Sequence, residues 1–215
     1  MKQSATHLTF WEEGCSLEEF QRWCGDSEKA FKKEIRKKIR EDGHKNILDC
    51  GAGVFSEYYG FKRDGYEIEY TAVEITPSFV ELGKKQGINA VNASFSKMPF
   101  DDNQFDSTIC LDVLNHQLDY KEEIMEMKRV TKNKIYISFF KPFSDDPAAS
   151  SELSNFTSQT TDAGIVLSRR EDEKGETTCI YNFFHRKRLT QFLEEIKLGY
   201  KKLKVEDNLI LILNK

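Results

Sequence analysis

Two apolar runs joined through a glycine turn constrain this chain more than any other feature. Residues 47–53 read Ile-Leu-Asp-Cys-Gly-Ala-Gly, and a second run, 70–74, ends in Glu74, 21 positions after Gly53. Strand, glycine turn, helix, strand and acid in this order are typical of a parallel sheet that binds a nucleoside. The glycines let a ligand approach the backbone, and the acid can accept hydrogen bonds from two ribose hydroxyls. We therefore expect a nucleoside site at the carboxyl ends of these strands.

The residue that discriminates between nucleoside ligands is Asp49, two positions before the first glycine. A carboxylate at this strand end repels a pyrophosphate but suits a ligand that carries an ammonium and a sulfonium. This favours S-adenosylmethionine over NAD. Ser56 occupies the third glycine position of the dinucleotide motif, which also argues against the alternative, a nucleotide-dependent oxidoreductase.

The composition indicates a soluble globular protein. The 215 residues are 32% charged and 39% hydrophobic. The formal net charge is −4, so the chain lacks the overall positive charge that is typical of proteins that bind nucleic acid. The basic run from Lys32 to Arg40, interleaved with Ile35 and Ile39, predicts the solvated face of an amphipathic helix, with phosphate binding as the less favoured alternative. The five cysteines form no C-x-x-C pair, so we expect no metal site, and their odd number suits a reducing compartment. No apolar leader or membrane-length run is found, so we expect a cytoplasmic protein without membrane contact.

Alternating strand and helix patterns predict a doubly wound sheet between residues 46 and 140. Residues 142–163, rich in Ser, Asp, Thr and Ala, predict a loop. We expect a single α/β domain with three layers and a seven-stranded, mostly parallel sheet whose last strand is antiparallel. Its parts would be an N-terminal helical cap (1–44), a cofactor-binding core (45–141), an insertion or lid after strand five that contains a hairpin of 165–168 with 177–184 (142–184), and a C-terminal helix and strand pair (185–215).

Four sequence blocks follow one another in a characteristic order between Asn46 and Phe140. They are Leu48-Asp49-Cys50-Gly51-Ala52-Gly53, Val73-Glu74-Ile75-Thr76, Met98-Pro99-Phe100-Asp101-Asp102-Asn103-Gln104-Phe105-Asp106 and Leu111-Asp112-Val113-Leu114-Asn115-His116. In these blocks the chain resembles the class I S-adenosylmethionine-dependent methyltransferases. A lone glycine motif is weak evidence, whereas four blocks in order are specific. The resemblance also implies that a sixth strand and an antiparallel seventh close the sheet.

The resemblance implies a cofactor contact for each matched position. Gly51, Ala52 and Gly53 would line the methionine and ribose parts of the cofactor, and Asp49 would hold its amino group. Glu74 would bind the ribose hydroxyls, Ile75 would pack on the adenine, and Ser94 and Phe95 would lie at the adenine amino group and ring. Asp112, Val113 and Leu114 would pass near the sulfonium. Two positions depart from the family pattern. Phe55 stands near a common glycine, where it would narrow the site or turn outward, and Ser94 replaces a common aspartate, which would weaken the contact with the adenine amino group.

The reaction itself leaves few signatures in a sequence. Methyl transfer from a sulfonium is an in-line displacement, in which positioning supplies much of the rate and a base is needed only if the acceptor loses a proton. His116 and His185 are candidate bases and Tyr181 a candidate for positioning the acceptor, each with a purely structural role as the alternative. The N-terminal aromatic residues would belong to the core or line the acceptor pocket; they are Phe10, Trp11, Phe20 and Trp23. The resemblance implies that N-terminal helices cover the cofactor, which would bring Trp11 and Trp23 to the site.

The acceptor class follows from what the fourth-strand loop lacks. Asp112-Val113-Leu114-Asn115 stands where enzymes that methylate amino groups of nucleic acids carry a Pro-Pro-Tyr type motif. We therefore expect transfer to oxygen or nitrogen of a small-molecule acceptor. The alternative is a non-catalytic protein that binds S-adenosylmethionine, and the oligomeric state is left open.

Overall fold

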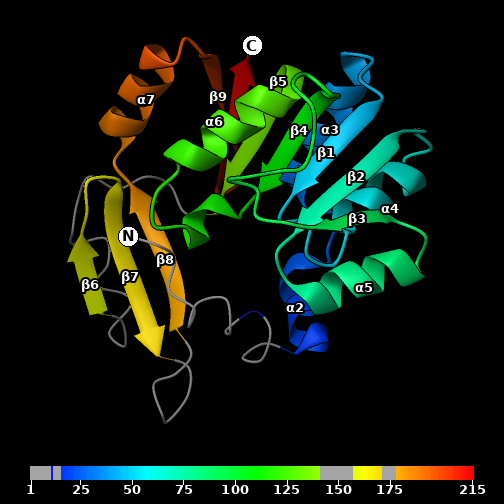
Figure 1. The fold of residues 1–215 in the computed structure, drawn as a ribbon, viewed down its shortest axis with the longest axis horizontal. Coiled ribbons are helices and arrows are strands. Elements are labelled where there is room, and N and C mark those ends of the chain that lie inside the picture. The colour runs from blue at the N-terminus through cyan, green and yellow to red at the C-terminus, as the bar shows by residue number, and fades with distance from the viewer. Residues whose placement is uncertain (1–10, 12–15, 141–156, 171–177) are drawn as a thin grey trace.

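A seven-stranded sheet forms the centre of the protein in the computed structural model, which describes residues 11, 16–140, 157–170 and 178–215 (Figure 1). Its strand order is β3-β2-β1-β4-β5-β10-β9. Strands β1 to β5 are mutually parallel, and β10 is antiparallel to both of its neighbours. The strands are β1 (Asn46–Cys50), β2 (Glu69–Glu74), β3 (Asn89–Asn92), β4 (Phe105–Leu111), β5 (Thr131–Phe139), β9 (Gly199–Val205) and β10 (Asn208–Asn214). The predicted mostly parallel sheet with an antiparallel last strand is confirmed.

Helices cover both faces of this sheet. Helices α3 (Ala30–Glu41) and α4 (Ser56–Arg63) pack on the face that carries Ile47, and α5 (Pro77–Lys85) packs beside β2 and β3. Helices α6 (Lys121–Val130) and α7 (Arg186–Glu195) pack on the face that carries Leu48. Ile47 and Leu48 are adjacent and face opposite ways, as the alternation of side chains along a strand requires. No helix in the described part of the chain is long and apolar enough to cross a membrane.

The segment after strand five forms a second, three-stranded sheet in the order β6-β7-β8. Strands β7 (Gly164–Arg170) and β8 (Thr178–Phe184) pair antiparallel, as the predicted hairpin requires. The loop prediction for 142–163 is wrong at its end, because β6 (Thr157–Thr160) pairs with β7. Its sequence, Thr-Ser-Gln-Thr, has no apolar residue to alternate with polar ones, so the period-two signal of a strand is missing. Residues 142–156 of that prediction lie outside the described residues.

The small sheet is joined to the loop after β4 by buried hydrogen bonds. The Asn182 side chain in β8 donates to the carbonyls of Gln117 (3.1 Å) and Leu118 (3.0 Å), and the Asn115 side chain donates to the Asn182 carbonyl (3.0 Å). Asn115 and Asn182 are both buried. Strand β8 therefore holds the short 3-10 helix η1 (Leu114–His116) in place at the carboxyl edge of the large sheet.

Helix α3 corrects the prediction of a solvated basic face. Lys32 and Arg36 are buried, and only part of the run, such as Lys33 and Lys37, faces solvent. The Arg36 guanidinium donates to Glu57 (3.0 Å) and Asp64 (2.8 Å), both beyond the helix in sequence. A buried cation persists only where anions and hydrogen bonds offset its lost hydration, and here α4 and the loop after it supply them.

Candidate active site

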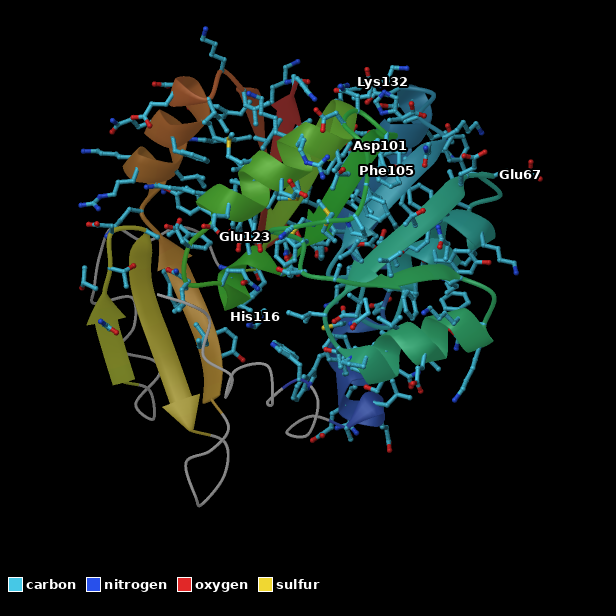
Figure 2. The ribbon with its side chains drawn as sticks, in the orientation of Figure 1. Glu67, Asp101, Phe105, His116, Glu123 and Lys132 are labelled. Carbon is cyan, nitrogen blue, oxygen red and sulfur yellow. The ribbon has the colours of Figure 1, made fainter. Side chains whose placement is uncertain are left out.

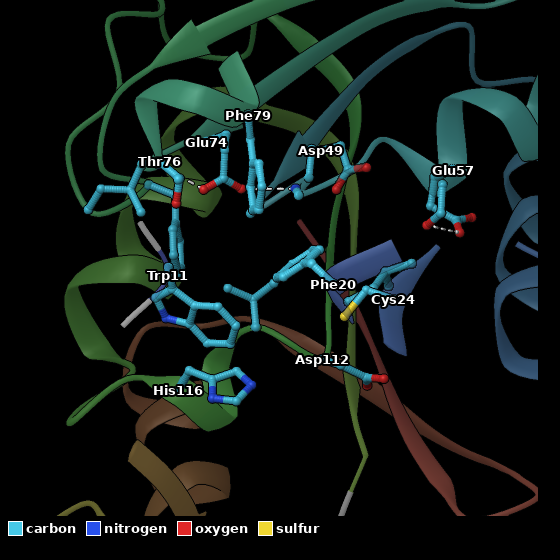
Figure 3. A pocket seen from close by; sticks show the side chains of 18 of the residues that line it. Trp11, Phe20, Cys24, Asp49, Glu57, Glu74, Thr76, Phe79, Asp112 and His116 are labelled. Atoms are coloured by element: carbon cyan, nitrogen blue, oxygen red, sulfur yellow. Dashed lines mark hydrogen bonds between the residues drawn. The ribbon is translucent and has the colours of Figure 1, made fainter. Parts of the chain in front are cut away.

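A cavity opens at the carboxyl ends of β1, β2 and β4 (Figure 3). Its empty volume, counted out to the open mouth, is about 1040 Å³, which is comparable with cavities that hold small organic ligands. Every residue that the sequence assigned to the cofactor lines it, with the exception of Leu114. Leu114 is fully buried and packs in the core instead. Of the three other candidates, His116 lines the cavity, while Tyr181 and His185 are not among its described lining residues.

The glycine turn after β1 forms the floor of the cavity. Gly51 and Gly53 have φ angles of +73° and +52°, in the left-handed region that favours glycine. The Gly51 amide donates to the Val73 carbonyl (2.8 Å), so the turn is tied to the end of β2. A Cβ atom on Gly51 would lie 2.7 Å from both methyl carbons of Val113. The turn therefore brings the backbone of the first loop directly against the fourth-strand loop.

Gly51→Ala is expected to lower the free energy of unfolding by about 2–3 kcal/mol, since a left-handed conformation costs alanine about 1–2 kcal/mol and overpacking adds at least about 1. Gly87→Ala is the matched control, because Gly87 has a φ of +75° and a Cβ added to it would meet no described atom within 4 Å. It should lose only the backbone part, about 1–2 kcal/mol. Urea unfolding of both variants measures the difference. Equal losses would show that Val113 moves aside and that the close approach is not required.

Glu74, at the end of β2, is held rigidly at the side of the cavity. Its Oε2 accepts from the Gly53 amide and its Oε1 from the Thr76 amide, both at 2.9 Å (Figure 3). Burial raises the pKa of Glu74, while these two amides lower it. The two carboxylate oxygens carry four lone pairs in all, so Glu74 has acceptor capacity beyond these two amides. This fixed carboxylate suits the hydroxyls of a diol.

Asp49, at the end of β1, is a buried carboxylate that accepts from a neighbouring strand. The Tyr70 hydroxyl of β2 donates to its Oδ2 at 2.5 Å. Burial raises the pKa of Asp49 to about 7, although the Tyr70 hydrogen bond lowers it. Such a carboxylate gains its negative charge readily when a cation enters the cavity beside it.

The side of the cavity beyond Glu74 is mostly apolar. Ile75 is 37% exposed there, and Phe95 lines the same part of the wall. The Ser94 hydroxyl is hydrogen-bonded to that of Ser96 (2.8 Å). Phe55 does not line the cavity; it turns away, is fully buried, and packs against Gly83 and Ala90. The aromatic residue at this departure from the family pattern therefore leaves the site open.

The loop after β4 forms the cavity wall beside the glycine turn. Asp112 has a φ of +60°, and its Oδ1 accepts from the Ser138 hydroxyl (2.6 Å) and from the Asn208 side chain (3.1 Å). Burial raises the pKa of Asp112, and the Ser138 hydrogen bond lowers it. Strands β5 and β10 thus fix its carboxylate, and Val113 faces the glycines. Both Asp112 and Val113 line the cavity.

A cavity with a rigid carboxylate for a diol, a second carboxylate for a cation and an apolar slot matches a nucleoside that carries a charged amino acid. Residues 48–139 match the family model described as the methyltransferase domain. The match covers 92 of the 215 residues, so this core of the chain resembles a methyltransferase domain. The methyl donor of this family is S-adenosylmethionine.

Known proteins resemble this chain over most of its length. An uncharacterized protein of Methanocaldococcus jannaschii is 26% identical over 194 residues, which are 87% of this chain and 80% of that protein. The structure of an S-adenosylmethionine-dependent methyltransferase from Clostridium acetobutylicum has a TM-score of 0.63 at 14% identity and covers 84% of this chain and 88% of its own. The 1,6-didemethyltoxoflavin-N1-methyltransferase of Burkholderia thailandensis, solved with that compound and S-adenosylhomocysteine, has a TM-score of 0.57 at 18% identity, covering 88% and 80%. At these identities the structures establish a shared fold.

His116 lies in a cluster of aromatic rings. Its Nδ1 is 2.9 Å from the Ile180 carbonyl of β8, which can only accept, so Nδ1 carries a proton. In the neutral ring, Nε2 then holds the lone pair. The rings of Trp11 and Tyr181 lie 4.9 and 5.2 Å from that of His116. In Figure 2, His116 lies between the small sheet and helix α2 (Leu17–Cys24).

Several cavity residues were not assigned to the cofactor from the sequence. Helix α2 has no buried residue, yet Phe20 and Cys24 line the cavity, and a Cβ on Gly53 would lie 2.5 Å from the Phe20 ring. Trp11 lines the cavity too, as one of the two alternatives predicted, whereas Trp23 is 50% exposed and does not. The further lining residues without an earlier role are Lys32, Ser56, Glu57, Thr76, Phe79, Leu111 and Gln117. The amphipathic pattern of α2 was the one available signal, because an apolar stripe on an exposed helix must face something.

Proposed function

We propose that the protein transfers a methyl group from S-adenosylmethionine to oxygen or nitrogen of a small-molecule acceptor. The observation that carries the proposal is the pair of carboxylates, Asp49 and Glu74, at the tips of adjacent strands on either side of one glycine turn. They match the two hydrogen-bonding ends of the donor, an amino acid ammonium and a ribose diol. An NAD pyrophosphate would meet the Asp49 carboxylate instead.

The cavity residues would bind and orient the donor. Glu74 would accept from the ribose hydroxyls, Asp49 would pair with the ammonium, and Ile75 and Phe95 would enclose the adenine. Asp112 and Val113 would lie along the methionine part. When bound, the sulfonium supplies the methyl group to the attacking atom, and its bonding electron pair returns to sulfur. The rate then depends on holding the two reactants in line and away from water. Such positioning alone can lower the activation free energy by about 7–11 kcal/mol.

The acceptor would enter beside His116, where Trp11 and Phe20 also line the cavity. These rings favour a compact organic molecule over a macromolecule, and the Burkholderia enzyme, an N1-methyltransferase solved with a small compound bound, supports this class. For an acceptor that must lose a proton, we propose His116 Nε2 as the base. Direct roles for Tyr181 and His185 remain predictions, as does a cytoplasmic location.

The test has two stages, ligand binding and then turnover. S-adenosylhomocysteine should raise the melting temperature and NAD should not, because only a ligand of the native state stabilises it. Stabilisation by NAD alone would overturn the proposal in favour of an oxidoreductase. Release of S-adenosylhomocysteine in the presence of small hydroxyl and amine compounds would separate an enzyme from a non-catalytic binding protein. His116→Gln should then slow turnover without weakening donor binding.

Donor binding should strengthen as the pH rises through about 7. Asp49, with a pKa of about 7, is mostly protonated at pH 6 and mostly ionised at pH 8, and only the ionised form attracts the ammonium. The dissociation constant of S-adenosylhomocysteine should therefore be about tenfold lower at pH 8 than at pH 6. Isothermal titration calorimetry at both pH values measures this. Asp49→Asn should bind more weakly and lose most of the pH dependence; an unchanged slope would assign the effect to another group, such as Glu74.

A further inference from the structure

Lys32 lies at the end of the cavity where the methionine part of the donor would be bound. It comes from helix α3, is buried, and lines the cavity together with Asp49, Ser56 and Glu57. Its Nζ donates to the Ser56 hydroxyl (2.6 Å) and to the Cys24 carbonyl (2.9 Å). Two elements beside its own, α2 and α4, therefore hold this ammonium at the cavity wall.

The hydrogen bonds of Lys32 leave capacity for an anionic ligand. An ammonium has three N–H donors, and the described part of the structure gives Lys32 two hydrogen bonds. The nearby Glu57 carboxylate is 3.6 Å away, in ionic contact but beyond hydrogen-bond length. Glu57 is also shared, because it accepts a 3.0 Å hydrogen bond from Arg36. The nearby anion of Lys32 is thus already engaged by a second cation.

The charges at this end of the cavity also point to a carboxylate ligand. Lys32 is the one lysine or arginine among the described residues that line the cavity, whereas Asp49, Glu57, Glu74 and Asp112 are all acidic. The acids suit the ammonium and sulfonium of the donor. The remaining charge of the donor is its α-carboxylate, and Lys32 is the group that complements it.

We propose that Lys32 binds the α-carboxylate of S-adenosylmethionine and thereby selects the intact donor against its decarboxylated form, the donor used for aminopropyl transfer. The inference rests on the proposed function and goes beyond it, because it names the residue that determines donor specificity. A decarboxylated donor keeps the adenosine, the sulfonium and the amine, but it offers no carboxylate to Lys32, whose nearby anion Glu57 is shared with Arg36. The affinity for the decarboxylated donor is therefore lower, while the affinity for the intact donor is unaffected.

The test compares two donors on three proteins by titration calorimetry. Wild type should bind S-adenosylmethionine at least about 10-fold more tightly than decarboxylated S-adenosylmethionine, since a charged hydrogen bond contributes about 1.5–3 kcal/mol, or roughly 10- to 100-fold. Lys32→Met should lose that preference by weakening the intact donor alone. Lys29→Met is the matched control: Lys29 donates to the Trp23 carbonyl (2.9 Å) next to the same helix but does not line the cavity, so its preference should equal that of wild type.

The outcomes separate the inference from the proposed function. If wild type binds neither donor, the proposed function fails. If wild type binds both donors equally, or if Lys32→Met weakens both by the same factor, the cofactor assignment stands and the role of Lys32 is overturned. Comparing wild type with both donors needs no variant, so the inference is testable even if Lys32→Met does not fold. Ser56→Ala, which removes one partner of Lys32, should reduce the preference a few-fold.

Discussion

Replacing Glu74 with alanine is expected to weaken the binding of S-adenosylhomocysteine by about 100-fold or more. The ribose hydroxyls would lose two hydrogen bonds to a charged acceptor, and each such bond makes a net contribution of about 1.5–3 kcal/mol. The same change removes the acceptors of the Gly53 and Thr76 amides. The floor of the cavity would therefore lose its alignment as well. Titration calorimetry with S-adenosylhomocysteine measures the loss directly.

Glu69→Ala is the matched control for that experiment. Glu69 begins the same strand, is exposed, and lies at the far end of β2 from the cavity. Its binding should equal that of wild type. Near-normal affinity of Glu74→Ala would contradict the cofactor site as a whole. Among the described cavity residues, Glu74 is the one carboxylate at the end of β2 that could accept from the ribose hydroxyls.

Replacing Arg36 with methionine is expected to lower the free energy of unfolding by about 3–5 kcal/mol. The Arg36 side chain is 1% exposed and bonds Glu57 and Asp64, and it also donates to the Ser27 carbonyl (2.9 Å). Methionine fills similar space but leaves the Glu57 carboxylate, which is 3% exposed, with Lys32 as the one cation paired to it among the described residues. An incompletely paired buried charge is the source of the loss. Urea unfolding measures it.

Two further variants separate charge from packing at this site. Lys37→Met, one position along, removes an exposed lysine whose ion pairs with Glu34 and Glu41 are 4.0 and 3.8 Å long, and it should change stability by less than about 0.5 kcal/mol. Adding Glu57→Met to Arg36→Met should recover part of the stability, because the incompletely paired carboxylate is then gone. If the double variant is no more stable than Arg36→Met, lost packing rather than lost charge compensation explains the result.

The elements that were predicted correctly are those whose signal is local. Strands β1, β2 and β4 are apolar runs, and α6 shows Ile124, Met127 and Val130 on one buried face. Strand β6 was missed because it is an edge strand of a small sheet and its four polar residues carry no alternation. It is a strand because β7 offers it backbone partners, which a reading of residues 157–160 alone does not reveal.

The same division applies to the candidate site. Asp49, Glu74 and the glycines were predicted because a strand end, a turn and a fixed spacing bring them to one edge of a parallel sheet. Lys32 and Arg36 were misassigned to solvent because their periodicity is that of an ordinary amphipathic helix, and their burial follows from acids 21 to 28 positions away that α4 and its following loop present. The Leu114 side chain follows the cavity residues Asp112 and Val113 in sequence but packs in the core, because its neighbours there come from other parts of the chain.

The sequence by itself determined the sheet, the glycine turn and the two carboxylates, because hydrophobic period, glycine conformation and strand-end position are properties of a few neighbouring residues. Only the tertiary structure decided which ammonium faces the cavity and which nitrogen of His116 carries the proton, since the Ile180 carbonyl that fixes it is 64 residues away. Charges and proton positions depend on partners brought together by folding, and neither composition nor local spacing encodes those partners.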